Sequence, residues 1–244
     1  MARTNGKTAG TGEPSAREAE RRRTILRAAI EVFARKGYHG CRIADVAKEA
    51  GVAYGLVYHY FQNKDELLSS VFDTAWKGFV GRLEGVATGD APLAEKIRGV
   101  ARVAFEAYRH DPRAVRVLIL EIARSPAGAK VDRGGAFVDI IRLAESMFRQ
   151  AQVRGELRAD LDARLAAAMM FGAIEMGLTS FVVGLFDPKD EAALERVQRQ
   201  IAEVFLTGVL SPAAAAAHAG ASAGSEVAWK KSTSTTKSPA PRRA

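Results

Sequence analysis

Two short apolar stretches meet at Gly51, inside the segment Gly37–Leu68. A glycine at this junction permits a tight turn between two short helices, where a side chain would clash. If the apolar residues of both stretches pack together, an outward row remains on the second one: Tyr54, Gly55, Tyr58 and His59. An amphipathic helix that exposes hydroxyls and an imidazole suits the major groove of DNA. The residue types in this row therefore predict contact with a nucleic acid.

Residues beside this row complete the predicted contact. We expect the bare backbone at Gly55 to come close to DNA and Leu56 to touch a thymine methyl group. Hydrogen bonds to phosphates are expected from three side chains: Tyr58, His59 and Tyr60. Lys64 opens the following helix, where its charge and the helix amides can meet one phosphate together.

The elements that must position these residues are helices. Apolar residues recur at helical spacing, and no alternating β-branched run bounded by turn residues predicts a strand. Helices are expected over residues 16–36, 43–50 and 53–61, from about residue 64, and over 91–109, 112–124, 128–155, 161–184 and 189–209. The pattern predicts an all-α protein of about nine helices.

Local signals fix several of the expected helix ends. Gly37 supplies a stop for the first long helix. Asp111 before Pro112, and Asp187 before Pro188, have the form of an N-cap followed by a proline in the first turn. Residues 213–218 are expected to extend the last helix at most briefly, because nothing in the sequence there predicts an anchor.

Charge is unevenly distributed along the 244 residues, whose formal net charge is +8. Residues 1–65 carry twelve Lys/Arg against seven Asp/Glu, a net of +5, and residues 211–244 carry five against one, a net of +4. The middle, residues 66–210, carries nineteen against twenty, a net of −1. A basic amino-terminal module on a neutral body is typical of a nucleic-acid binder, although a merely soluble basic protein has the same balance. The run Arg21-Arg22-Arg23 fits a phosphate contact and a solvated helix start equally well.

The sequence gives little support for an enzyme. It has no glycine-rich phosphate loop, no HExxH motif and no paired cysteines, and its four histidines (His39, His59, His110 and His218) lack metal-ligand spacing. We therefore expect no catalytic residues, no metal and no resident cofactor. Cys41 is the single cysteine, which fits a reducing compartment and a packed small residue better than a redox sensor.

At this point the segment around Gly51 resembles the amino-terminal domain of the TetR family of bacterial repressors. The resemblance covers about residues 20–70 and is specific, because many spaced positions agree at once. The matching residues are Ile25, Ala28-Ala29, Phe33, Gly37-Tyr38, Ile43, Asp45-Val46-Ala47, Ala50-Gly51-Val52, Gly55, Tyr58, Phe61 and Lys64-Asp65-Glu66-Leu67.

The resemblance implies a three-helix DNA-binding domain of the helix-turn-helix type, followed by a helical domain for ligand binding and dimerisation. Its recognition helix would be Ala53–Tyr60. The implied base-reading residues are Tyr54, Gly55 and Leu56, and the implied DNA contacts overall are Arg42, Ala53, Tyr54, Gly55, Leu56, Tyr58, His59, Tyr60 and Lys64. The family often has Thr at position 41, Ser or Thr at 42 and Thr at 56, so this chain loses an N-cap hydrogen bond and its operator sequence stays open.

Four regions follow from this interpretation. Residues 1–15 are expected to be a disordered arm, 16–62 the DNA-binding domain, 63–210 the ligand-binding and dimerisation domain, and 211–244 a disordered basic tail. The implied partners are double-stranded operator DNA, a second copy of the chain and a small hydrophobic ligand.

The segment Leu165–Phe186 is long and apolar enough to span a bilayer. Glu175 near its middle opposes insertion, so a buried core or dimer helix is the expected role and a membrane-associated protein is the alternative. The first residues contain no apolar stretch of a signal peptide, and a cytoplasmic location is expected.

Large apolar side chains on several later helices predict a ligand pocket between helices. The candidate ligand-binding residues are Phe72, Trp76, Phe105, Tyr108, Phe137 and Phe171. A plain hydrophobic core explains each of them equally well. Basic groups are available in an arginine-rich set, Arg98, Arg102, Arg109, Arg113 and Arg116, most of which a solvated face also explains.

Residues 155–183 resemble a narrower group, the fatty-acid-degradation repressors that respond to long-chain acyl-CoA. The resemblance rests on Leu161-Asp162, Arg164-Leu165-Ala166, Met170-Phe171-Gly172 and Ile174-Glu175, with a looser match at Glu121–Arg124. It implies an acyl-CoA effector that releases the repressor from DNA. A non-lipid effector, such as a drug-like efflux substrate, is the alternative.

The last two long helices are expected to form the dimer interface as a four-helix arrangement with those of the partner. Small residues on the first let helices approach closely, and an apolar stripe runs along the second. The predicted interface residues are Ala168, Gly172, Ser180, Leu194, Val197, Ile201 and Phe205.

Overall fold

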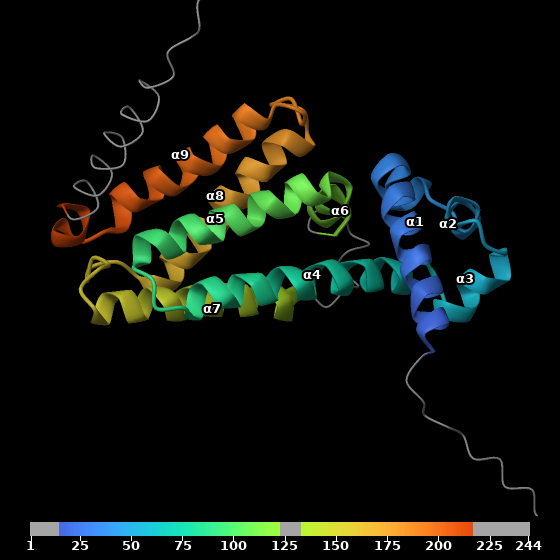
Figure 1. The fold of residues 1–244 in the computed structure, drawn as a ribbon, viewed down its shortest axis with the longest axis horizontal. Helices are drawn as coiled ribbons and strands as arrows, with labels where there is room; N and C mark the ends of the chain where they lie inside the picture. The colour runs from blue at the N-terminus through green and yellow to red at the C-terminus, as the bar shows by residue number, and fades with distance from the viewer. Residues whose placement is uncertain (1–14, 123–132, 217–244) are drawn as a thin grey trace, which may run out of the picture. The chain divides into compact units, whose positions relative to one another are not determined.

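The computed structural model describes residues 15–122 and 133–216. The expected arm before Ser15, most of the expected tail, and part of the Glu121–Arg124 match lie outside the described residues. Within them the protein is helical, with nine α-helices and one short π-helix (Figure 1). The described residues also contain an isolated antiparallel β-bridge between Leu157 and Leu210. The prediction of an all-α fold is confirmed.

Four helices make up the amino-terminal part: α1 (Ala16–Gly40), α2 (Ile43–Ala50), α3 (Tyr54–Tyr60) and α4 (Lys64–Thr88). The α1 start is fixed by a capping box, in which Ser15 Oγ accepts from Glu18 N and Glu18 Oε2 accepts from Ser15 N. Gly37 interrupts the helical dihedrals with φ 70° and ψ 166°, as its predicted role as a stop requires. One further turn nevertheless follows, up to Gly40.

The later helices are α5 (Leu93–His110), α6 (Pro112–Arg116), the π-helix η1 (Val117–Ile122), α7 (Arg133–Val153), α8 (Ala163–Val182) and α9 (Glu191–Val209). The predicted start at Asp111 and Pro112 is confirmed, since Asp111 Oδ1 accepts from Ala114 N at 2.9 Å. A single helix over 112–124 is wrong, because α6 ends after five residues and the chain continues as η1.

Two further expectations about helix ends need correction. The N-cap of α9 is Asp190, whose side chain accepts from Ala193 N, and not Asp187, whose side chain accepts from Lys189 N in the preceding turn. The chain after α9 is also anchored: Ser211 Oγ donates to the carbonyl of Gly155 at 2.7 Å. Residues 212–216 then form one helical turn, so the predicted disordered tail does not begin at residue 211.

The chain divides into two compact units. Unit 1 is drawn from Met1–Lys77 and Asp111–Asp132, and unit 2 from Gly78–His110 and Arg133–Ala244. The predicted boundary after residue 62 does not coincide with this division, because unit 1 includes α4 as far as Lys77 and the segment α6–η1, which packs on α1. Arg113 Nη1 contacts Glu31 Oε2 at 2.6 Å, and Arg116 Nε donates to the carbonyl of Ala34 at 3.2 Å.

Unit 2 is a layered helical bundle in which α8 packs on α7, and α9 packs on both α5 and α8 (Figure 1). Its core is apolar, with Phe105, Phe148 and Phe181 fully buried. Close packing of α8 on α9 is favoured by the glycine at position 177, where a side chain would make Ile201 shift. A Cβ there would lie 2.4 Å from Ile201 Cδ1 and 3.3 Å from Phe105 Cζ.

Candidate nucleic-acid interface

A short turn at Gly51 sets the position of α3 against α2. Gly51 adopts φ 66° and ψ 32°, in the left-handed region that favours glycine. Its N–H and that of Val52 cap α2 by donating to carbonyls at its end, with Val52 N to Ala47 O at 3.0 Å. Val57 and Phe61 are then buried, which leaves the opposite side of α3 facing outward.

No described residue covers the outward face of α3. Tyr54 is 53% exposed and Tyr58 42% exposed. Their hydroxyls lie 3.2 Å apart and their rings pack edge to face at 5.1 Å. This hydrogen bond is the main reason that the pKa of the Tyr58 hydroxyl is raised, so that hydroxyl is protonated at neutral pH. These groups are available as hydrogen-bond donors and acceptors to a ligand.

The other predicted contacts on α3 surround this tyrosine pair. Gly55 is exposed, and a Cβ built there would have no atom within 4 Å. His59 is exposed and packs edge to face on Tyr60 at 5.0 Å. Leu56 and Tyr60 are half-buried at the margins, and Ala53 is the exposed N-cap residue. The structure therefore brings all seven predicted residues of positions 53–60 other than Val57 to one side or its edges.

Arg42, also a predicted DNA contact, is exposed at the start of α2. Its side chain makes no N-cap hydrogen bond, as the sequence predicts. Instead its backbone N–H donates to Asp45 Oδ2 at 3.0 Å. The pKa of Asp45 is lowered, first by its hydrogen bond from Lys36 and then by that from Arg42, so a carboxylate compensates for part of the missing cap.

Lys64 has a different environment from the one predicted. Its Nζ donates to the carbonyls of Tyr38 at 2.7 Å and Cys41 at 3.0 Å. It also lies 4.1 Å from the centre of the Tyr38 ring, a cation–π distance. Two of its three donors thus bind the end of α1, and no local pattern could predict this because the partners lie 23 and 26 residues away in the chain. Its predicted phosphate contact stays a prediction.

Arg22 and Arg23 are engaged within the protein. Arg22 Nη2 donates to Ser70 Oγ at 3.1 Å and its guanidinium lies over the Phe61 ring. Arg23 pairs with Glu20 at 2.6 Å. Arg22 therefore links α1 to α4, whereas Arg23 pairs within α1.

The six predicted ligand-binding residues are divided between the two units, two in unit 1 and four in unit 2, and their role in ligand binding stays a prediction. Phe72 and Trp76 stack on each other in unit 1, with ring centres 5.1 Å apart. In unit 2, Phe137 contacts Phe171 edge to face at 5.5 Å, between α7 and α8. The other two, Phe105 and Tyr108, are buried on α5, where Tyr108 packs against Phe181 at 5.8 Å.

The predicted dimer residues separate into two groups. On α8, Ala168 and Gly172 are exposed and Ser180 is half-buried. Large apolar side chains on the same helix are exposed beside them: Leu165, Met169 and Met176. The α8 residues therefore offer an apolar outer surface.

The predicted α9 residues contact the protomer's own helices, and their role in a dimer interface stays a prediction. Leu194 is only 3% exposed, and Phe205 stacks on Phe148 of α7 at 5.9 Å. Val197 and Ile201 lie close to Gly177 of α8. The outward apolar residue of α9 is instead Val204, which is 74% exposed. An apolar period identifies a packed face but not whether that face packs within one chain or between two.

Among the described helices, α8 is the one long and apolar enough to cross a membrane, with a mean hydropathy of 1.6. Half of that stretch is buried within the protein, in contacts with α7, α9 and α5. Core helices of water-soluble proteins commonly have this composition, so the feature is weak support for a membrane span.

The chain is similar in sequence to known bacterial regulators. Residues 25–71, which contain α2, α3 and the junction with α4, match the family described as bacterial regulatory proteins, tetR family. The fatty acid metabolism regulator protein of Bacillus subtilis (strain 168) is 30% identical over 185 residues, which are 76% of this chain and 93% of that protein.

Two solved structures are similar over about three quarters of this chain. The regulator FadR from Bacillus subtilis in complex with stearoyl-CoA is 29% identical, with a TM-score of 0.68, covering 76% of this chain and 98% of that one. The fatty acid degradation regulator FadR from Bacillus halodurans is 26% identical, with a TM-score of 0.69, covering 77% and 95%.

Proposed function

We propose that this chain, which belongs to the TetR family of bacterial regulatory proteins, represses transcription and is released from DNA by a long-chain acyl-CoA. The chain is a transcriptional regulator of a family that binds operator DNA as homodimers.

The observation that carries the DNA-binding part is the uncovered face of α3. A row with exposed tyrosine hydroxyls, an exposed imidazole and a bare backbone at Gly55 suits readout of base edges and phosphates. In a two-fold dimer, two such helices about 34–36 Å apart would read successive major grooves of a pseudo-palindrome. A wider spacing between the helices would fit a longer site.

The effector part rests on the relatives. The Bacillus subtilis FadR structure contains stearoyl-CoA, and the regulator of that organism is named for fatty acid metabolism. The apolar contacts in unit 2, such as Phe137 with Phe171, are consistent with a lining for an acyl chain. We infer that acyl-CoA favours a conformation of the dimer with a different separation of its two α3 helices.

This mechanism has a thermodynamic consequence. Coupling between two sites is reciprocal, so operator DNA must weaken acyl-CoA binding by the same factor by which acyl-CoA weakens operator binding. Equal acyl-CoA affinity with and without operator would contradict the allosteric part of the proposal.

The test uses a duplex selected for binding from a random pool, labelled for fluorescence anisotropy. Stearoyl-CoA is added to the complex of this duplex with the full chain, and stearate and free coenzyme A are added separately as controls. The proposal expects release by stearoyl-CoA at concentrations where neither control acts. If stearoyl-CoA binds no better than the controls and leaves the complex intact, this effector assignment fails.

We also propose that the protein acts in the cytoplasm and catalyses no reaction. Relatives that match this chain over nearly their whole length are named as regulators, which supports a non-catalytic role.

A further inference from the structure

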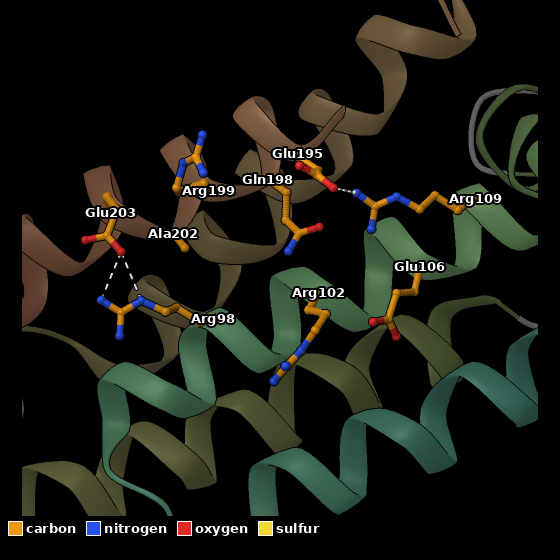
Figure 2. A pocket seen from close by; sticks show the side chains of 9 residues that line it. All are labelled: Arg98, Arg102, Glu106, Arg109, Glu195, Gln198, Arg199, Ala202 and Glu203. Carbon is orange, nitrogen blue, oxygen red and sulfur yellow. Dashed lines mark hydrogen bonds and ion pairs between the residues drawn. The ribbon is translucent and has the colours of Figure 1, made fainter. Parts of the chain in front are cut away.

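A polar pocket lies between α5 and α9 in unit 2. Its lining is mostly charged, in contrast to the apolar core of the unit. Its volume is about 380 Å³, within the range of small-molecule sites. Figure 2 shows side chains of α5 and α9 facing one another across it. Four arginines line it: Arg98, Arg102 and Arg109 on α5, and Arg199 on α9. The first three belong to the arginine set that the sequence singles out.

Two of these arginines are neutralised by acidic residues of α9. Arg98 binds Glu203, with both Nε and Nη2 at 2.9 Å from Oε1. Arg109 lies 3.1 Å from Glu191 and 3.8 Å from Glu195. Such pairs between partly exposed groups contribute little stability, and a stronger anion can compete for them.

The other two arginines are not neutralised in this way. Within the described residues, neither Arg102 nor Arg199 forms an ion pair or a hydrogen bond, and both are exposed. Gln198, between them in the pocket, has a buried side-chain oxygen without a hydrogen-bond donor. The pocket thus combines two unused guanidinium groups with an unused acceptor, which suits a ligand that carries both negative charge and a donor.

Guanidinium groups favour phosphates because their planar donors match two phosphate oxygens at once. One acidic side chain of the lining opposes this: Glu106, exposed on α5, has no cationic partner among the described residues. The negative charge of Glu106 opposes the binding of an anion, so removal of this charge should strengthen that binding.

The apolar interior lies directly behind the pocket. Ala202, in the lining, is buried, and Ile201 beside it approaches Gly177 of α8. Phe105 of α5 also lies close to Gly177, so the inner sides of α5 and α9 are part of the hydrophobic core. A ligand with an anionic end and an apolar end would match this change of character across the two helices.

We propose that the α5–α9 pocket binds the phosphate groups of the coenzyme A half of the effector, chiefly through Arg102 and Arg199. This inference rests on the proposed acyl-CoA function and adds to it the position of the polar half of the ligand.

The test is isothermal titration calorimetry on the full-length protein with stearoyl-CoA, and with stearate as the probe that lacks phosphate. The double variant Arg102→Gln, Arg199→Gln is compared with the wild type. Arg142→Gln is the matched control, because Arg142 is an exposed arginine on α7 outside the pocket, paired only weakly with Asp139 at 3.4 Å. Circular dichroism checks that each variant is folded.

The double variant should bind stearoyl-CoA about tenfold or more weakly, the loss expected for two charge-assisted contacts. Its affinity for stearate and the affinity of Arg142→Gln for stearoyl-CoA should match the wild type. Glu106→Gln should bind stearoyl-CoA more tightly. Wild-type affinity for stearoyl-CoA in the double variant would overturn the pocket assignment alone, whereas absence of stearoyl-CoA binding to the wild type would overturn the proposed effector and this subsite with it.

Discussion

At position 55 the missing side chain has no cause within the described protein, because a Cβ there would contact nothing within 4 Å. Nor does the backbone require glycine, since no positive φ occurs at this residue. A glycine in the first turn of a helix weakens it relative to alanine. The reason for Gly55 is therefore best sought in a ligand that approaches α3.

We predict opposite effects of Gly55→Ala on stability and on DNA binding. The free energy of unfolding should not fall, because the methyl group meets no protein atom and alanine favours the helix. Operator affinity should fall, because the methyl group meets the DNA. Gly85→Ala is the control, since Gly85 of α4 is also exposed with open space around it. Thermal unfolding and fluorescence anisotropy measure the two quantities; unchanged operator affinity in Gly55→Ala would refute close backbone approach.

Cys41 illustrates how burial sets chemistry at a single residue. Its side chain is buried, and burial raises the pKa of the thiol to about 11, an effect that nearby Lys64 only partly offsets. The folded state disfavours the thiolate, so the free energy of unfolding should fall as pH rises from about 9, the ordinary value, through about 11.

The corresponding prediction concerns reactivity. Alkylation of Cys41 by iodoacetamide in the folded protein should reach its half-maximal rate near pH 11, whereas the urea-unfolded chain should do so near pH 9. Mass spectrometry at a series of pH values gives both profiles. A folded-state midpoint near 9 would show that Cys41 is accessible and would reopen a redox role.

At the scale of elements, Lys64 joins three helices of unit 1. Its ammonium group binds carbonyls at the end of α1 and before α2, while it opens α4. The adjacent Asp65 accepts a hydrogen bond from the Tyr38 hydroxyl. Burial, and secondly this bond, raise the pKa of Tyr38 to about 12, so the hydroxyl remains protonated at physiological pH and holds α4 against α1.

We predict that Lys64→Met lowers the free energy of unfolding by about 1–3 kcal/mol, the usual loss when charged hydrogen bonds to buried carbonyls are removed. Lys48→Met is the matched control, since Lys48 is exposed on α2. Urea denaturation measures both. A Lys64→Met variant as stable as Lys48→Met would mean that the bonds to α1 contribute nothing. A flatter salt dependence of its DNA binding would add a phosphate contact to its role.

Helices were predictable to the extent that their signals are local. The start at Asp111 and Pro112 and the turn at Gly51 follow from a few adjacent residues, and both predictions are confirmed. The α9 start was not predictable in this way, because Asp187 and Asp190 are both suitable caps and the turn at Pro188 decides between them.

The candidate sites divide by the same criterion. The exposed row of α3 follows from helical period, since burial of Val57 and Phe61 dictates which residues remain outside. The bond between Arg98 and Glu203 joins residues 105 positions apart, and nothing local to either residue predicts it. For the same reason the sequence could not show that the apolar stripe of α9 packs inside its own subunit.

At the scale of the whole molecule, a homodimer needs an apolar contact surface, and the outer face of α8 offers one. Met176 is 58% exposed, and Leu165 and Met169 are exposed to a similar degree on the same helix. Small residues nearby, Ala168 and Gly172, allow a second helix to come close. We expect this face, rather than the inward stripe of α9, to supply most of the contact with the partner subunit.

Met176→Glu should therefore give a folded monomer, because a two-fold interface would bury two carboxylates in apolar surroundings. Sedimentation velocity at micromolar concentration should show the change in mass, with unchanged helical circular dichroism and loss of operator binding. Val153→Glu is the control, an exposed apolar residue at the end of α7 that is 89% exposed. A Met176→Glu variant that remains dimeric would place the interface elsewhere.

Selection of bound duplexes from a random-sequence pool by the full-length protein tests the central claim most directly. If the uncovered face of α3 reads DNA from both subunits, wild-type protein should enrich two half-sites related by two-fold symmetry, and Gly55→Ala should lose this enrichment while remaining folded. A wild-type pool that stays random at low salt as well as at physiological salt would contradict the account.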